Sequence, residues 1–140
     1  MTRRILLDIN IVLDVLLNRK QYVTTSGALW RASDRGEFEG HLAAFSLPTI
    51  YYICERQQSR AAAQEAVDRC LEAFAICALY RETALAAREL TGPDFEDNLQ
   101  ISCAVTDFLH GIVTRDTAGF QSSPLKVFSP QELIAELSNR

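Results

Sequence analysis

The chain has 140 residues, of which 48% are hydrophobic and 23% are charged, and it contains only 6 Gly and 4 Pro. This composition excludes collagen-like and low-complexity chains, and no apolar run approaches the roughly 20 residues that cross a bilayer, so we expect no membrane association. The length predicts a single domain over residues 1–140, and the formal charge of −4 gives no overall basic field, so a nucleic-acid partner would need a local site.

The N-terminal segment begins with a short apolar run at residues 4–7, which we interpret as a buried strand. Asp8 ends this run and no small-residue cleavage site follows. The segment is therefore not typical of a secretory signal, and we expect an unprocessed cytoplasmic protein. A turn at 8–10 and a helix to about Asn18 follow, with Asn10 as the expected N-cap.

Helical and strand-like segments alternate through the rest of the chain. Apolar residues at helical spacing, capping residues and Gly or Pro breaks predict helices at 24–35, 48–57, 60–74, 83–90, 94–109 and 130–140. Short apolar runs predict strands at 40–45, 75–79, 111–114 and 125–128. Parallel strands joined by helices are covered on both faces, so the expected fold is α/β, a three-layer α/β/α sandwich with about five strands.

The cysteines show no metal-binding pattern in the sequence. They form no C-x-x-C pair, and His41 and His110 stand apart from them along the chain. A zinc site needs clustered nitrogen and sulfur ligands, so zinc is not expected. We interpret all four as buried, reduced thiols: Cys54, Cys70, Cys77 and Cys103.

Three aspartates lie at positions that the predicted fold would bring to the same edge of the sheet. Asp8 ends the first strand, Asp116 follows the fourth, and Asp97 lies in the first turn of the helix that leads to the fourth. Ligands bind at the carboxyl ends of parallel strands, so these carboxylates should gather at one edge. Each aspartate also has a purely structural explanation: Asp8 and Asp116 as turn residues, and Asp97 as an acidic residue in the first turn of a helix capped by Asp94. Converging carboxylates need a proton or a cation, and oxygen-only ligands suit Mg²⁺ or Mn²⁺.

Other catalytic motifs are missing from the sequence. It contains neither G-x-G-x-x-G nor G-x-x-x-x-G-K-[ST], which argues against dinucleotide and P-loop sites. It also lacks G-x-S-x-G, which argues against a serine hydrolase. A phospho-accepting receiver domain would need an acceptor aspartate after a central strand, whereas the third predicted strand ends at Leu79 and Tyr80.

Four segments resemble the PIN domain family. They are 6–14 (LLDINIVLD), 94–100 (DFEDNLQ), 112–116 (IVTRD, with Phe120) and 127–133 (VFSPQEL). Their order and spacing agree with the family over about residues 5–137, and the stretch 49–53 resembles a bacterial subgroup of these domains.

The resemblance implies a Mg²⁺- or Mn²⁺-dependent ribonuclease, often the toxin of a VapC-type toxin–antitoxin pair. By position, Asp8, Asp97 and Asp116 would be the catalytic and metal-binding acids. Asn10 would orient the Asp8 carboxylate, and Thr114 would place its hydroxyl beside the site. The implied partners are an RNA substrate, an antitoxin protein and a second copy of the chain.

One position departs from the family pattern. A typical PIN nuclease carries a further acid, usually glutamate, on the helix after the second strand, where this chain has Thr49. The alternative is therefore a catalytically weakened PIN fold that binds nucleic acid or protein. The stretch 50–53 and the small-residue helix 60–66 provide either core or a surface for an antitoxin or a dimer.

Three other side chains each have two interpretations. Asp14 is either an ordinary polar position on the first helix or an additional group near the site. Arg115 is either a phosphate contact or, as we favour, a solvated surface arginine. Trp30 is expected in the core rather than as a platform for stacking bases.

Overall fold

Five short strands form a parallel sheet at the centre of the fold. In the computed structural model, which describes residues 2–139, these strands are β1 (Arg4–Leu7), β2 (Glu39–Ala43), β3 (Ala75–Cys77), β4 (Gly111–Val113) and β5 (Lys126–Phe128). Their order is β3-β2-β1-β4-β5, and every neighbouring pair is parallel. Because parallel neighbours need a crossover connection, the helices are placed on the two faces of the sheet.

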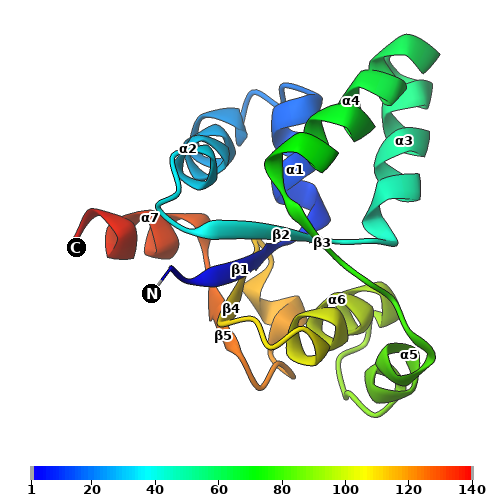
Figure 1. The fold of residues 1–140 in the computed structure, drawn as a ribbon, viewed down its shortest axis with the longest axis vertical. Helices are drawn as coiled ribbons and strands as arrows, with labels where there is room; N and C mark the ends of the chain where they lie inside the picture. Colours follow the sequence, from blue (N-terminus) through cyan, green and yellow to red (C-terminus); the bar gives the residue numbers. More distant parts are fainter. Residues whose placement is uncertain (1, 140) are drawn as a thin grey trace.

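The helices cover the sheet in two layers (Figure 1). They are α1 (Ile9–Leu16), α2 (Val23–Asp34), α3 (Ser46–Gln57), α4 (Arg60–Ala73), α5 (Arg81–Arg88), α6 (Phe95–Thr106) and α7 (Pro130–Ser138). A short 3₁₀ helix, η1 (Thr117–Phe120), follows β4. In Figure 1, α1 to α4 lie above the sheet and α5 and α6 below it, which confirms the predicted three-layer α/β fold.

Alternating side chains of β1 supply both halves of the core. Ile5 and Leu7 pack with the side chains of α1 to α4 and α7, whereas Leu6 packs against α6 and η1 on the opposite face. This is the two-residue alternation of a strand that is buried on both sides. Trp30 lies in the first half with its ring edge against Phe74, at 4.8 Å between centroids, so its predicted core position is confirmed.

Side-chain hydrogen bonds cap the amino ends of α4, α6 and α7. The Ser59 hydroxyl accepts from the Ala62 amide, Asp94 accepts from the Asp97 amide, and Ser129 accepts from the Glu132 amide. The prediction of Asn10 as an N-cap is wrong. Helix α1 begins earlier, at Ile9, with Asp8 in the N-cap position.

Several predicted boundaries are too long by a few residues. The strand predicted at 75–79 ends at Cys77, and the helix predicted to reach 109 ends at Thr106. The second boundary is set by the backbone, because Phe108 adopts a positive φ of 56° that an α-helix does not accommodate. The 3₁₀ helix η1 was not predicted, since only its Asp116 cap marks it in the sequence.

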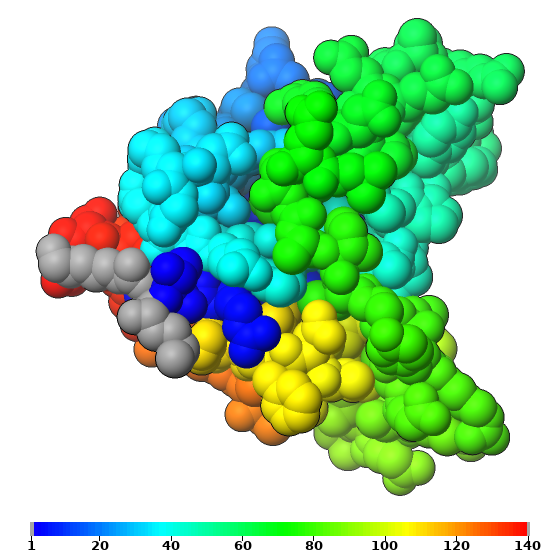
Figure 2. All heavy atoms as spheres, in the orientation of Figure 1, coloured from blue at the N-terminus to red at the C-terminus, as the bar shows by residue number. Residues whose placement is uncertain are grey.

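The carboxyl ends of the parallel strands all lie at one side of the molecule. In the space-filling view, the α3–α4 pair and α5 project on either side of the sheet where β2 ends and leave a hollow outline between them (Figure 2). Within residues 2–139, no helix combines the length and apolar character required to cross a membrane.

Gly111 lets β4 approach β5 closely. A Cβ at this position would lie 2.9 Å from the Lys126 carbonyl oxygen and 2.9 Å from Phe128 Cε2. Because one of these atoms belongs to the backbone, Gly111→Ala is expected to lower the free energy of unfolding by about 1–3 kcal/mol in urea denaturation.

The matched control is Gly27→Ala in α2. A Cβ at Gly27 would meet only the far end of the flexible Arg31 side chain, at 3.2 Å. Alanine is the better helix former, so this variant should be neutral or more stable by up to about 1 kcal/mol. Equal losses in the two variants would contradict close packing at Gly111.

Candidate acidic site at the carboxyl edge of the sheet

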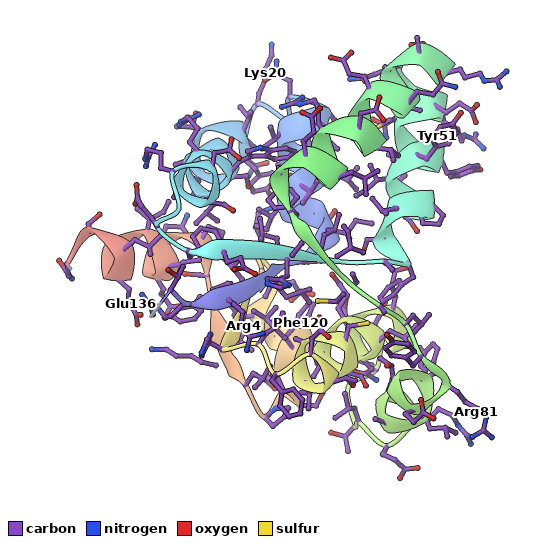
Figure 3. The ribbon with its side chains drawn as sticks, viewed as in Figure 1. Arg4, Lys20, Tyr51, Arg81, Phe120 and Glu136 are labelled. Carbon is purple, nitrogen blue, oxygen red and sulfur yellow. The ribbon has the colours of Figure 1, made fainter. Side chains whose placement is uncertain are left out.

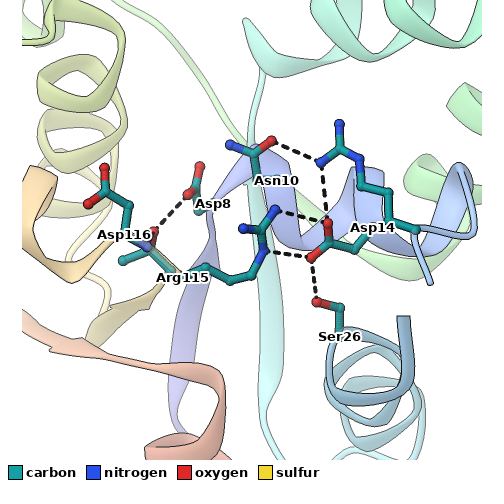
Figure 4. Close-up of polar contacts among 8 residues, drawn as sticks. Asp8, Asn10, Asp14, Ser26, Arg115 and Asp116 are labelled. Carbon is teal, nitrogen blue, oxygen red and sulfur yellow. Dashed lines mark hydrogen bonds and ion pairs between the residues drawn. The ribbon is translucent and has the colours of Figure 1, made fainter. Parts of the chain in front are cut away.

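The three predicted aspartates lie at the same edge of the sheet. Asp8 directly follows β1, Asp116 follows β4 and caps η1, and Asp97 lies in the first turn of α6. Figure 4 shows Asp8 and Asp116 beside each other. Asp97 and Asp116 both approach Gly119, because a Cβ at Gly119 would lie 2.7 Å from Asp116 Oδ2 and 3.0 Å from Asp97 Oδ2. The topology therefore brings together carboxylates that are far apart in sequence.

Two hydrogen bonds fix the orientation of the Asp8 carboxylate, which is only 4% exposed. The Gln100 amide donates to Oδ1 at 3.1 Å, and the Thr114 hydroxyl donates to Oδ2 at 2.7 Å. Gln100 also accepts from the Ile9 amide, and the Thr114 oxygen accepts from the Asp116 amide. One buried carboxylate thus links the start of α1, the first turns of α6 and the end of β4.

Gln100 is the residue of this arrangement that sequence reasoning missed. It lies three residues after Asp97, on the same face of α6, and is 1% exposed. A buried glutamine at that spacing from a predicted site acid is the signal that could have identified it. Thr114, in contrast, is named by the family resemblance; its hydroxyl contacts Asp8, and its role in the site stays a prediction.

Burial and like charges raise the pKa of the Asp97 carboxyl to about 7. Desolvation is the largest cause, and the neighbouring carboxylates follow in the order Asp94, Asp8, Asp116 and Glu96. Burial, Asp94 and Asp8 likewise raise the pKa of Glu96, whose side chain is exposed but lies close enough to these carboxylates to feel their charge. The edge therefore concentrates negative charge that the protein alone leaves poorly compensated.

The residues present fit a hard divalent cation. The donor atoms at this edge are carboxylate oxygens, which Mg²⁺ and Mn²⁺ prefer. Asp116 Oδ2 and Asp97 Oδ2 lie 2.7 and 3.0 Å from the position that a Cβ at Gly119 would take, so these two carboxylates face the same small space. Mg²⁺ usually retains several water molecules, so a few carboxylates are enough to hold it.

Asn10 and Thr49 contribute no carboxylate to the edge. Asn10 is exposed, and its Oδ1 accepts from Arg19 Nη1 at 3.2 Å (Figure 4). Its predicted role in orienting Asp8 stays a prediction. Thr49 is half-buried in α3 and cannot supply the acid that the family pattern has there.

Asp14 and Arg115 form a buried ion pair that neither interpretation anticipated. Arg115 donates from Nε to Asp14 Oδ2 at 2.9 Å and from Nη2 to Oδ1 at 3.0 Å (Figure 4). Ser26 and Arg19 also donate to this fully buried carboxylate. Arg115 stacks on the Tyr22 ring at 3.6 Å. The favoured expectation of a solvated Arg115 was therefore wrong.

This ion pair ties α1 to the segment that carries Asp116. We predict that Arg115→Met lowers the free energy of unfolding by up to about 3 kcal/mol, because it leaves the buried Asp14 carboxylate with weaker compensation. Urea denaturation measures the loss. Arg19→Met is the matched control, since Arg19 makes one longer contact of 3.2 Å with Asp14, and it should cost less. An equal or larger loss of unfolding free energy in Arg19→Met would contradict the assignment of Arg115 as the main partner of Asp14.

A second prediction concerns the pH dependence of stability in metal-free buffer. The pKa of Asp97 is about 7 in the folded chain and 3.8 as its ordinary value, so the folded state binds the proton more tightly. The stability that protonation of Asp97 contributes to the folded state is fully present below pH 4 and is lost as the pH rises through 7. Asp97→Asn should therefore be more stable than the parent at pH 8 by about 1–2 kcal/mol, a discounted part of the shift, and equally stable near pH 3.5.

Urea denaturation in EDTA at both pH values tests this expectation. The control is Asp68→Asn, which changes an exposed aspartate on α4. A gain in Asp68→Asn that matches the gain in Asp97→Asn would show that net charge, rather than the acidic edge, is responsible.

Comparisons with known proteins agree with this geometry. The family model described as PIN domain matches residues 4–118. No curated protein matches the chain in sequence. Among solved structures, the chain is similar to one in a VapBC2 complex from Rickettsia felis bound to promoter DNA, with 16% identity, a TM-score of 0.67 and coverage of 90% of this chain and 98% of that one.

Two further structures have the same fold. A chain of FitAB bound to an IR36 DNA fragment shows 17% identity and a TM-score of 0.71 over 90% of this chain and 94% of that one. A chain of a toxin–antitoxin complex from Klebsiella pneumoniae shows 17% identity and a TM-score of 0.66 over 89% and 96%. Since the family model spans most of the sequence and the strand order places its acids at one edge, the chain belongs to the PIN domain family.

Proposed function

We propose that this chain is a divalent-metal-dependent ribonuclease that hydrolyses RNA phosphodiester bonds, acting as the toxin of a toxin–antitoxin pair. The observation that carries the proposal is the buried Asp8 carboxylate, which Gln100 and Thr114 hold in one orientation at the acidic edge. A carboxylate that served only to end a strand would not need both of its oxygens fixed. Membership of the PIN family supports the same reaction class.

Asp8, Asp97 and Asp116 would hold Mg²⁺ or Mn²⁺, either directly or through water. When bound, such an ion supplies a polarised phosphoryl oxygen and a water of lowered pKa. The chain's own residues fix where that chemistry occurs. Thr114 holds Asp8 and the Asp116 backbone together, and the small Gly119 keeps space free between Asp97 and Asp116.

The phosphate of RNA needs this cation because the edge has little positive charge of its own. Arg115, the nearest arginine in sequence, is engaged by Asp14 through two hydrogen bonds. A phosphodiester would otherwise meet carboxylates at a site whose like charges already raise the pKa of Asp97. In the proposed reaction, substrate binding and metal binding are therefore coupled.

The proposed partners are an antitoxin protein and a second copy of the chain, in the cytoplasm where RNA is available. The similar structure from Klebsiella pneumoniae is a toxin–antitoxin complex by its description, and the one from Rickettsia felis is described as VapBC2 bound to promoter DNA. Large apolar side chains are exposed on several helices and on the segment between β3 and α5, and they leave surfaces for such partners: Tyr52, Leu71, Leu79, Tyr80, Leu85 and Phe95. Within the stretch 50–53, however, Ile50 is fully buried and Tyr52 is the exposed residue.

A cleavage assay tests the proposed activity. The purified chain is incubated with a mixed pool of structured RNA in Mn²⁺, and then in EDTA. We expect cleavage only with the metal, and a loss of about 100-fold or more in Asp8→Asn, the scale on which one essential electrostatic group acts. Asp68→Asn, which changes an exposed aspartate on α4, should keep the parent rate.

Cleavage that persists in EDTA or in Asp8→Asn would overturn the proposal. RNA retention without cleavage would instead favour the second candidate, a binding module, for which Thr49 at the family's acid position is the specific observation. Thr49→Glu separates the two functions, because an impaired nuclease should gain activity from the restored carboxylate whereas a binding module should not respond.

A further inference from the structure

A histidine, a cysteine and an aspartate lie together away from the acidic edge. His41 is on β2, Cys77 ends β3, and Asp107 follows the last turn of α6. One ligand atom from each lies within 4.8 Å of the other two. The expectation from the sequence was the opposite, because His41 and Cys77 are 36 residues apart. That expectation of separated histidines and cysteines was wrong for this pair.

The sheet register explains the contact. Ala43 pairs with Cys77 across β2 and β3, and His41 lies two residues before Ala43. Since residues two apart on a strand point to the same face, the imidazole and the thiol both enter the layer that holds α6. Asp107, at the carboxyl end of α6, meets them from that side.

The separation of the sulfur and nitrogen atoms suits a shared tetrahedral ion. Cys77 Sγ lies 3.7 Å from His41 Nδ1. In a tetrahedral zinc site with bonds of about 2.3 Å to sulfur and about 2.0 Å to nitrogen, these two ligand atoms are about 3.5 Å apart. A thiol proton can span the same distance, so the alternative is a cluster held by hydrogen bonds alone.

The histidine is oriented as metal ligands commonly are. Glu39 Oε1 lies 2.8 Å from His41 Nε2 and so holds a proton on that nitrogen. The lone pair of Nδ1 then points toward Cys77 and Asp107. His41 is 6% exposed and Cys77 is fully buried, which keeps both side chains in place.

The charges around the cluster leave a position for a cation. Burial and the Asp107 carboxylate raise the pKa of the Cys77 thiol, so without metal it keeps its proton. Arg4 donates to the backbone oxygens of Asp107 and Phe108, at 3.2 and 2.6 Å, and lies on the α6 side of the sheet (Figure 3). Arg4 is thus engaged by backbone oxygens beside the cluster, and a divalent ion would balance the Cys77 thiolate and Asp107.

We propose that His41, Cys77 and Asp107 form a binding site for a Zn²⁺-class transition metal. The Cys77 thiol releases its proton to solvent as the metal–sulfur bond forms, His41 binds as the neutral ring, and water completes the tetrahedron. The half-buried Asp107 provides the side from which the ion enters. This site would fasten β2, β3 and α6 to one another, and it does not depend on the proposed nuclease activity.

Titration with Co²⁺ tests the site, after removal of metals with chelator under reducing conditions. Co²⁺ bound to a thiolate gives a sulfur-to-metal charge-transfer band in the near ultraviolet, which binding to the carboxylates of the acidic edge cannot give. We expect the band in the parent chain, its removal by added Zn²⁺, and its loss in Cys77→Ala. Cys103→Ala is the matched control and should keep the band, since Cys103 Sγ contacts the Ala78 carbonyl oxygen.

Two milder variants test the ligand Asp107 and the residue that orients His41, and they guard against misfolding of Cys77→Ala. Asp107→Asn should weaken Co²⁺ binding at least 10-fold, and Glu39→Ala should weaken it about 10- to 100-fold without removing the band. Far-ultraviolet circular dichroism confirms the fold of each. The absence of the band in the parent chain at excess Co²⁺ would overturn the proposal and leave a hydrogen-bonded cluster only. A band that survives in folded Cys77→Ala, or disappears in Cys103→Ala, would also overturn it.

Discussion

The hydrogen bonds to the buried Asp8 carboxylate determine how the acidic edge is assembled. Gln100 reaches Asp8 from α6 and Thr114 reaches it from β4, so the elements that carry Asp97 and Asp116 both meet at this one group. The Thr114 oxygen also accepts from the Asp116 amide, which fixes the first turn after β4. The chain itself therefore holds the acids in place before any cation is bound, which is the preorganisation that an electrostatic site requires.

Like charges oppose this arrangement, and specific interactions offset them. The amino end of α6 carries Asp94, Glu96 and Asp97, where the helix dipole favours negative charge and the Asp94 side chain caps the helix. Farther from the edge, the Asp14–Arg115 pair fixes the backbone next to Asp116 without neutralising it, because Asp14 takes up the arginine's charge. The fold is thus held together beside the edge while the edge itself stays acidic, as a cation-dependent nuclease would need.

The sheet topology made it possible to predict that the three aspartates lie at one edge, whereas the pairing of individual side chains could not be predicted. Asp8 and Asp116 follow strands, and parallel strands bring their carboxyl ends together whatever the details of packing. Gln100 and Arg115 depend on contacts with residues 92 and 101 positions away, and no local pattern encodes such pairs. The prediction of Asn10 as an N-cap was wrong for a related reason. Helix α1 begins at Ile9, whose amide donates to Gln100 Oε1, a partner 91 residues away that no local capping pattern reveals.

Helix α6 connects the acidic edge to the His41–Cys77–Asp107 cluster. Asp97 lies in its first turn and Asp107 follows its last, so a rise of 1.5 Å per residue separates the two positions by about 15 Å along the helix. One ion cannot be shared over that distance, and each end must be held by its own contacts. Because α6 packs against the sheet through Ile101, Cys103 and Ala104, an ion fixed at its carboxyl end would restrict motion of the whole helix, including the turn that presents Asp97. Any effect of the second site on the first would therefore act through the position of a rigid helix rather than through direct electrostatics.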